Sequence, residues 1–203
     1  MGYPGVPYDQ IVLHEERFER TFPDGSFVFV NSMGEPYYWS GSQVKRVQDV
    51  ISKNPQAMFL LLTHNERTFD FWRVFENARF GLSITSDAEF RRFAVGNAAY
   101  VFDFLSFEPF KLSCSNKFDP LLEMRNEVSR VIMGGQSGLR PREEREYYRN
   151  NAFDFQSLVE ILEDLGWKTF VKENGKRFGV EPTLLTTSKA SEKKPVLDQY
   201  WKN

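Results

Sequence analysis

The stretch "FDFQSLVEILEDLGWKTFVKE", residues 153–173, decides the fold. Leucine and isoleucine side chains repeat at helical spacing between Leu158 and Leu165, which predicts a helix from the start of this stretch to Leu165. Gly166 then offers a C-terminal cap. The run "KTFVKE" follows at 168–173 with the composition of a strand. A helix that leads directly into a strand is the repeating unit of α/β proteins.

Five similar runs of β-branched and aromatic residues lie upstream of this unit, and segments with helical spacing separate them. Val44, Val47 and Ile51 mark one helix after the first run, and another is expected between Phe69 and Phe75. Strands joined by single helices pair in parallel through right-handed crossovers. We therefore predict an α/β protein with about six parallel strands in a partial (β/α) barrel, with an open doubly wound sheet as the alternative. The upstream runs span residues 26–31, 57–63, 79–85, 100–106 and 130–135.

The chain is long enough for one folded domain without disulfides or metals. Of its 203 residues, 41% are hydrophobic and 16% are aromatic, whereas disordered chains are poor in both classes. Proline, glycine and charged residues crowd residues 1–25, and Thr, Ser and Lys are frequent in residues 177–203. We expect an N-terminal arm, an α/β barrel-like domain over residues 26–176 and a flexible C-terminal tail.

Charge and cysteine content limit the classes of function. The 26 basic and 28 acidic side chains nearly cancel, so no overall field attracts nucleic acid or an anionic membrane. The single cysteine, Cys114, excludes an internal disulfide and a multi-thiolate metal site from this sequence alone, and we expect no metal site. Apolar runs such as 57–62 are far shorter than the roughly 18 residues of a membrane span. We expect a cytoplasmic protein.

Polar residues follow the predicted strands. In barrels and in doubly wound sheets, ligands bind at the carboxyl ends of the strands, where loops vary while the sheet holds them in place. We therefore expect a small polar ligand at these ends. The residues assigned to its binding are Asn31, Ser32, Thr63, His64, Gly134, Gly135 and Gln136, and those assigned to catalysis are Glu108 and Lys172.

Glu108 and Lys172 are the candidates for acid–base chemistry. Glu108 stands between Phe107 and Pro109, so a stiff backbone carries its carboxylate in an apolar neighbourhood, where it can exchange a proton or bind an amine or a sugar hydroxyl. Lys172 ends the last strand and can neutralise a phosphate or a carboxylate. The alternative is an internal ion pair of Glu108 with Lys172 or with Arg67.

The other candidates also have structural alternatives. Gly134 and Gly135 permit a sharp turn with exposed N–H groups that suit an anion or a ribose, or they form an ordinary turn. His64 can transfer protons near neutral pH, or it is solvated or caps a helix. Asn31 and Ser32 offer an amide and a hydroxyl to a ligand or cap the loop that follows.

Six short pieces of the chain, all near strand ends, occur in an order that is typical of one family. They read "FVFVNSM" (27–33), "LLTHNER" (61–67), "FGLSIT" (80–85), "FLSFEPF" (104–110), "VIMGGQSG" (131–138) and "FVKENG" (170–175), with a weaker echo in "LDQYW" (197–201). In this order they resemble the phage-associated, radical-SAM-like proteins of unknown function that are called three-Cys-motif proteins. The resemblance implies a radical-SAM-like barrel core and a nucleotide-like ligand, S-adenosylmethionine, at the strand ends.

The cysteine cluster that defines this family, and that would bind a [4Fe–4S] centre, has no counterpart in the sequence, because one thiolate cannot hold the cluster. The resemblance therefore implies a cluster-less relative without radical chemistry of its own, and no cofactor is expected from this chain alone. An alternative is one half of a split iron–sulfur enzyme whose cysteines another chain supplies.

Several aromatic segments suggest a different class, an interaction module of a phage or mobile element. Residues 139–151 interleave four arginines with Tyr147 and Tyr148, which suits nucleic acid, although their three glutamates are more typical of a solvated helix face. The aromatic residues at 37–39 can stack on a base or cover one end of the core. The C-terminal tail can dock on a replication or repair protein through its last residues, or it can pack back on the barrel, as the resemblance implies.

Overall fold

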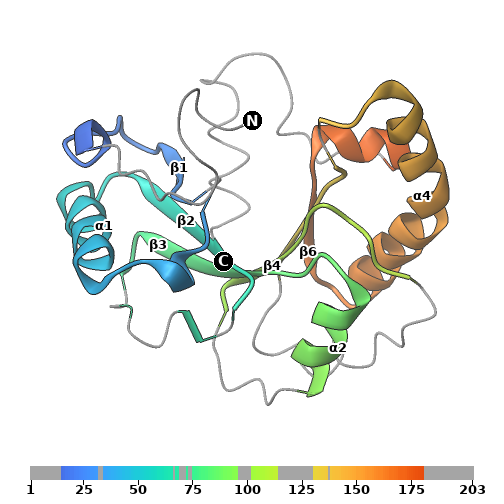
Figure 1. Ribbon diagram of the computed structural model, residues 1–203, viewed down its shortest axis with the longest axis horizontal. Coiled ribbons are helices and arrows are strands. Elements are labelled where there is room, and N and C mark those ends of the chain that lie inside the picture. The colour runs from blue at the N-terminus through green and yellow to red at the C-terminus, as the bar shows by residue number, and fades with distance from the viewer. Residues whose placement is uncertain are drawn as a thin grey trace.

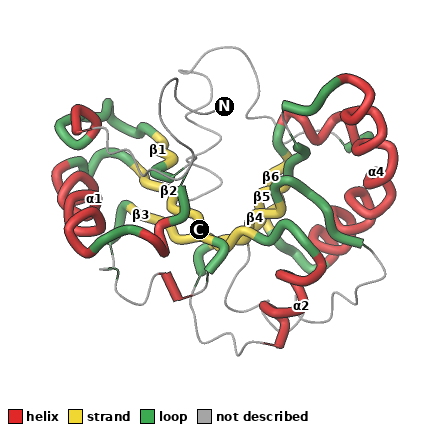
Figure 2. The backbone as a smooth tube through the Cα atoms, viewed as in Figure 1, coloured by secondary structure: helices red, strands yellow, loops and turns green. Residues whose placement is uncertain are grey.

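A curved sheet of six parallel strands forms the centre of the molecule (Figures 1 and 2). The structure is a computed structural model that describes residues 15–31, 34–65, 67–68, 72, 75–95, 102–113, 130–136 and 138–180. The strands are β1 (Phe27–Phe29), β2 (Met58–Thr63), β3 (Ala78–Ser83), β4 (Phe104–Phe107), β5 (Arg130–Met133) and β6 (Lys168–Val171). The helices are α1 (Gly41–Lys53), α2 (Asp87–Val95) and α4 (Pro141–Asp164), with 3-10 turns η1 (Glu15–Arg17), η2 (Pro36–Tyr38) and η5 (Glu173–Phe178).

The strand order distinguishes the two predicted architectures. In a doubly wound sheet the winding reverses at a switch point, so the order of the strands in space departs from their order in the sequence. Here each strand pairs with the next one along the chain, from β1 to β6. The helices lie on the outer side of the curled sheet (Figure 1). The partial barrel of six parallel strands is confirmed, and the doubly wound alternative is wrong.

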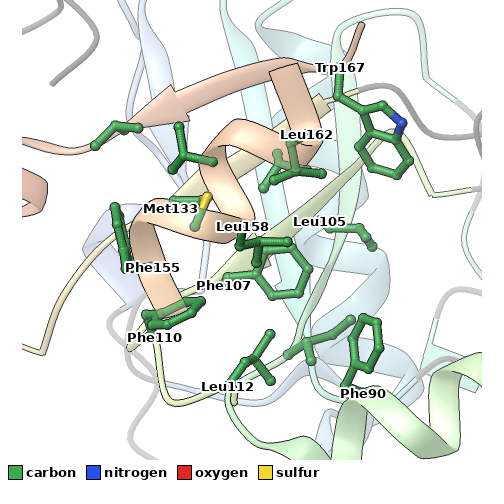
Figure 3. Packing of buried hydrophobic residues seen from close by; sticks show 14 of the residues in the cluster. Phe90, Leu105, Phe107, Phe110, Leu112, Met133, Phe155, Leu158, Leu162 and Trp167 are labelled. Carbon is green, nitrogen blue, oxygen red and sulfur yellow. The ribbon is translucent and has the colours of Figure 1, made fainter. Parts of the chain in front are cut away.

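Side chains alternate between the two faces of the sheet. On the outer face, Leu105 and Met133 pack with Phe155 and Leu162 of α4 in the main hydrophobic core (Figure 3). The N-terminal strands pack in the same way against α1. The concave inner face carries a separate cluster. Its buried members are Leu60, Phe104 and Ile132, and Phe27, Met58, Leu62 and Phe170 pack around them.

Local sequence signals explain where the helices begin and end. The predicted helix around Val44 is α1, which starts in a capping box: the Ser40 hydroxyl accepts from the N–H of Gln43 at 3.3 Å, and the Gln43 side chain accepts from the N–H of Ser40 at 2.6 Å. Most of the helix predicted between Phe69 and Phe75 lies outside the described residues.

Helix α4 is longer than the sequence predicted. Its apolar stripe follows Leu158, but the helix already begins at Pro141, because proline suits the first turn of a helix. It ends before Gly166, whose φ of 75° is a left-handed conformation that glycine adopts without strain. The charged segment 139–151 is therefore, from Pro141 onward, the first half of α4.

The turn η5 belongs to the hydrophobic core. Phe178 is 1% exposed, and its ring stacks on that of Phe155 with 4.1 Å between the centroids. The domain boundary expected at residue 176 thus leaves out a core residue, and residues 181–203 of the predicted tail lie outside the described part. Within the part of the chain that is described, none of the helices combines the length and the apolar character that crossing a bilayer requires.

Candidate functional site

A cavity of about 650 Å³ opens at the carboxyl ends of the strands. Its volume falls within the range of small-molecule sites, about 300–1,000 Å³. Five of the predicted residues line it, and they come from positions at or just after β1, β2, β4 and β6. These residues are Asn31, Thr63, His64, Glu108 and Lys172. Polar side chains that lie far apart in the sequence therefore line one cavity.

The alternation of side chains explains how further residues reach this cavity. Leu62, Ser83 and Ser106 occupy inward positions at the ends of β2, β3 and β4 and line the cavity. The two serines lie side by side in the β3–β4 ladder. Phe29, at the end of β1, adds an aromatic wall and is 40% exposed. The inward register of the predicted strands is the signal for these residues, which the polar loops beyond the strands do not reveal.

Glu108 and Lys172 form an ion pair on the cavity wall. Lys172 Nζ donates to Glu108 Oε2, and the two side chains remain 37% and 27% exposed, so solvent and small solutes reach the pair. The N–H of Lys172 donates to the carbonyl of Met133 at 2.9 Å, which fixes the position of the lysine at the end of β6. Of the two partners considered for Glu108, the structure thus selects Lys172 over Arg67.

Gly134 and Gly135 do not offer free N–H groups, so that expectation is wrong. The N–H of Gly134 donates to the carbonyl of Phe107 at 3.3 Å, and the N–H of Gly135 donates to Asn174 Oδ1 at 3.1 Å. The Asn174 amide returns a hydrogen bond to the carbonyl of Gly135 at 2.8 Å. Asn174 therefore links this turn to the turn after β6 through two hydrogen bonds.

The glycines instead allow other side chains to approach the backbone. A Cβ atom at Gly135 would lie 2.4 Å from the Tyr148 hydroxyl oxygen, and one at Gly134 would lie 3.2 Å from the Glu108 carboxylate. The Tyr148 hydroxyl also donates to the carbonyl of Gln136 at 3.2 Å. None of these three turn residues is among those that line the cavity. Of the three, Gly134 lies against the Glu108 carboxylate.

Asn31 extends the sheet by means of its side chain. Its Oδ1 accepts from the N–H of Leu62 at 2.9 Å, and its Nδ2 donates to the carbonyls of Leu62 and Gly34. The amide group therefore replaces the backbone of a further β1 residue and fixes the loop that follows. Ser32, the other candidate at this strand end, lies outside the described residues.

Thr63 has a structural role that depends on Glu35, which the sequence did not reveal. Thr63 is 1% exposed, and its hydroxyl bonds to the Glu35 carboxylate and to the Thr68 hydroxyl, the latter at 2.7 Å. The other oxygen of Glu35 accepts from the N–H of His64 at 2.8 Å. Glu35 thus joins the loops after β1 and β2 along one edge of the cavity.

His64 lines the cavity, and its ring contacts a glutamate that the sequence reasoning also missed. Its Nδ1 lies 3.1 Å from Glu89 Oε1 of α2. The imidazole is 49% exposed and the glutamate side chain 23%. His64 does not cap a helix by its side chain. It stands as an oriented, accessible imidazole at the end of β2.

The segment 139–151 differs from a nucleic-acid surface in one respect. Tyr148 is 5% exposed, and the hydroxyl of Tyr147 donates to the carbonyl of Phe110 at 2.6 Å. Burial raises the pKa of both tyrosines, so both stay protonated and packed in the core. Tyr148 is therefore too buried to stack on a base, whereas contact of the rest of this segment with nucleic acid stays a prediction.

The aromatic residues at 37–39 divide between surface and core. Tyr37 and Tyr38 are 51% and 71% exposed, whereas Trp39 packs beside Trp72, with 6.2 Å between the ring centroids. Only the tryptophan covers the end of the core. The C-terminal tail, for which docking on a protein partner is one prediction, lies outside the described residues, which end at Val180.

In the described ranges, no three His, Cys, Asp or Glu side chains are grouped so that they could hold a metal ion, and Cys114 lies outside those ranges. No family, curated protein or solved structure was found to match this chain. Its function must therefore be inferred from the geometry of the cavity.

Proposed function

We propose that this protein binds a small polar ligand of the nucleoside type, such as S-adenosylmethionine, in the cavity at the strand ends, without radical chemistry of its own. The observation that carries the proposal is the composition of the cavity wall: an aromatic and aliphatic side, two serines, and a solvent-accessible ion pair. Sites for small organic molecules typically combine apolar walls with a few placed polar groups.

Each part of such a ligand has a complementary part of the wall. Phe29 and Leu62 offer an apolar surface to a flat base. The hydroxyls of Ser83 and Ser106 suit the hydroxyls of a ribose. The Glu108–Lys172 pair suits an amino-acid end, because Glu108 can accept from its ammonium group while Lys172 donates to its carboxylate.

The charge of the wall favours a ligand without a phosphate chain. Among the described residues, the charged side chains that line the cavity are Glu35, Glu108 and Lys172, with His64 as a fourth when it is protonated. Two carboxylates and one ammonium give this described part of the wall a net negative charge, which repels polyphosphates. Should the bound ligand react, Glu108 and Lys172 are the residues that we assign to acid–base chemistry on it.

Calorimetric titration with S-adenosylmethionine, adenosine and ATP tests the proposal. We expect S-adenosylmethionine to bind more tightly than adenosine, because only the former reaches the ion pair, and ATP to bind most weakly. Glu108→Ala should weaken S-adenosylmethionine binding at least about 10-fold, since a hydrogen bond to a charged group contributes about 1.5–3 kcal/mol.

The matched control removes a carboxylate from another ion pair, outside the cavity. Asp49→Ala disrupts the exposed Lys45–Asp49 pair on α1 and should leave the affinity unchanged. Absence of heat with all three compounds contradicts the proposal. Equal affinities of the wild type and Glu108→Ala would show that binding occurs elsewhere on the protein.

A further inference from the structure

A histidine–carboxylate pair stands at the cavity, separate from the Glu108–Lys172 pair. His64 follows β2, whereas Glu108 follows β4, so the two lie two strands apart along the same edge of the sheet, about 10 Å at the usual strand spacing. Glu89, the partner of His64, projects from the first turns of α2. Neither the ligand proposal nor its acid–base residues make use of this pair.

Both oxygens of Glu89 are held in place. Oε2 accepts from the N–H of Thr85 at 2.6 Å and from the Thr85 hydroxyl at 2.7 Å, which leaves Oε1 for His64 Nδ1 at 3.1 Å. Burial acts to raise the pKa of Glu89, but the hydrogen bonds from Thr85 and the nearby His64 outweigh it and lower the pKa. Glu89 is therefore a carboxylate at neutral pH and can only accept hydrogen bonds.

The position of His64 is fixed on its backbone side as well. Its N–H donates to Glu35 Oε2 at 2.8 Å, and its carbonyl accepts from Arg92 Nη2 at 3.2 Å. Glu35, Glu89 and Arg92 are the charged groups that contact this residue among those described. Hydrogen bonds through both the N–H and the carbonyl therefore hold the backbone of His64 in place.

We infer that His64 is a proton acceptor for a ligand or water in the cavity, and that Glu89 is the positioning residue that holds its ring. A carboxylate beside Nδ1 requires the proton on that nitrogen, so the lone pair of the neutral ring is on Nε2, the atom left for the cavity. When a hydroxyl or water gives up its proton, the O–H bond breaks, an Nε2–H bond forms, and the electron pair stays on the oxygen as a nucleophile.

The tautomer of His64 tests this inference in the free protein, whatever ligand binds. The sequence contains only two histidines, His14 and His64. Long-range ¹H–¹⁵N correlation spectra of the imidazole rings, assigned with His14→Gln, separate protonated from unprotonated ring nitrogens. We expect neutral His64 to carry its proton on Nδ1, the opposite of the tautomer that an unrestrained histidine prefers. A proton on Nε2 overturns the inference.

Two variants separate the carboxylate from the fold of the loop. Glu89→Ala should shift His64 toward the Nε2–H tautomer. Thr85→Val removes another hydrogen bond to the same carboxylate and should leave the tautomer unchanged, because the N–H of Thr85 still holds Oε2. An unchanged tautomer in Glu89→Ala, with wild-type dispersion in the amide spectrum, refutes the role of Glu89.

Accessibility of Nε2 is tested by acylation with diethyl pyrocarbonate, followed by mass spectrometry. His64 should be modified in the folded protein at neutral pH, as its 49% exposure and its place on the cavity wall require. A His64 that resists the reagent until the protein is unfolded shows that Nε2 does not face an open cavity, and it overturns the inference.

Discussion

Gly81 is the position where one added methyl group should disturb the inner face of the sheet most. Gly81 lies on β3 between Leu62 of β2 and Phe104 of β4. A Cβ atom there would lie 2.4 Å from Cε2 and Cζ of the Phe104 ring and 2.8 Å from Cδ2. Carbon atoms in contact prefer about 3.5–4.0 Å, so the ring must move by roughly 1 Å.

The ring of Phe104 is fully buried, so it can move only against its neighbours. Phe104 is 0% exposed and packs with Leu60 and Ile132 in the inner cluster. Overpacking of this kind lowers the free energy of unfolding by about 1–3 kcal/mol. For a chain of this length each kcal/mol shifts Tm by about 2–4 °C, so Gly81→Ala should lower Tm by roughly 2–12 °C.

The same substitution at Gly41 provides the control. No atom lies within 4 Å of a Cβ built at Gly41, and this residue starts α1. Because alanine favours helix over glycine by up to about 1 kcal/mol, Gly41→Ala should be neutral or stabilising. Urea denaturation of both variants gives the comparison. Phe104→Leu alone and combined with Gly81→Ala completes a double-mutant cycle, in which Gly81→Ala should cost less beside the smaller leucine than beside the phenylalanine ring. The reasoning is refuted if Gly81→Ala is no less stable than Gly41→Ala, or if the Gly81 and Phe104 effects simply add.

Three further predictions concern other parts of the fold. The pKa of Glu89 is lowered in the folded protein, so the stability that this carboxylate contributes is present above its unfolded pKa of about 4.3 and is lost as the pH falls through the folded value. The difference in unfolding free energy between the wild type and Glu89→Gln should therefore shrink from pH 7 to pH 3. A difference that stays constant would refute this. Phe155→Ala removes a fully buried ring that stacks on Phe178 and should cost about 3–5 kcal/mol in urea denaturation, so a loss below about 1 kcal/mol would contradict the packing. Asn54→Ala removes a 2% exposed side chain that accepts from the N–H of Phe22 at 3.1 Å, and should cost about 1–3 kcal/mol with earlier hydrogen exchange at Phe22; unaltered exchange there would contradict the bond.

The strands could be predicted because each one is a local feature of the sequence. Every observed strand begins and ends inside, or within one residue of, a predicted run of β-branched and aromatic residues. The choice between a barrel and a doubly wound sheet could not be made in this way. It depends on the side from which each crossover returns to the sheet, and hydrophobic periodicity contains no information about that side.

The candidate site could be predicted only in part, for a similar reason. Glu108, Lys172 and His64 follow strands, and the ends of parallel strands lie at one edge of a sheet, so their proximity follows from the fold. Glu35 and Glu89 belong to a loop and a helix that reach the same edge through turns of irregular geometry. No spacing in the sequence indicates that they pair with His64.

The double glycine after β5 shows how one sequence signal serves two physical needs. A pair of glycines after a strand suits a backbone that approaches a ligand, and it equally suits a backbone that other side chains approach. Here Tyr148 occupies the space beside Gly135, and the carboxylate of Glu108 lies beside Gly134. The second need accounts for these two close approaches, so the glycines are not evidence for a ligand.

The inner face of the sheet changes from apolar to polar along its strands, and this change ties stability to binding. Along β4 the inward residues are Phe104, Ser106 and then Glu108, and along β3 they are Gly81 and Ser83. Phe104 closes the floor over Gly81, so a ligand that enters from the strand ends meets the serines and the ion pair. Gly81→Ala displaces the ring of Phe104, which belongs to β4. Ser106 and Glu108 lie only two and four residues further along the same segment, so a shift of the β4 backbone would move them as well. We therefore expect Gly81→Ala to weaken ligand binding as well as folding, whereas Phe155→Ala, which acts on the outer face, should reduce stability with little change in affinity at temperatures where the variant remains folded. Equal affinities of both variants in these titrations would mean that the position of Phe104 does not affect the serines and the ion pair at the strand ends.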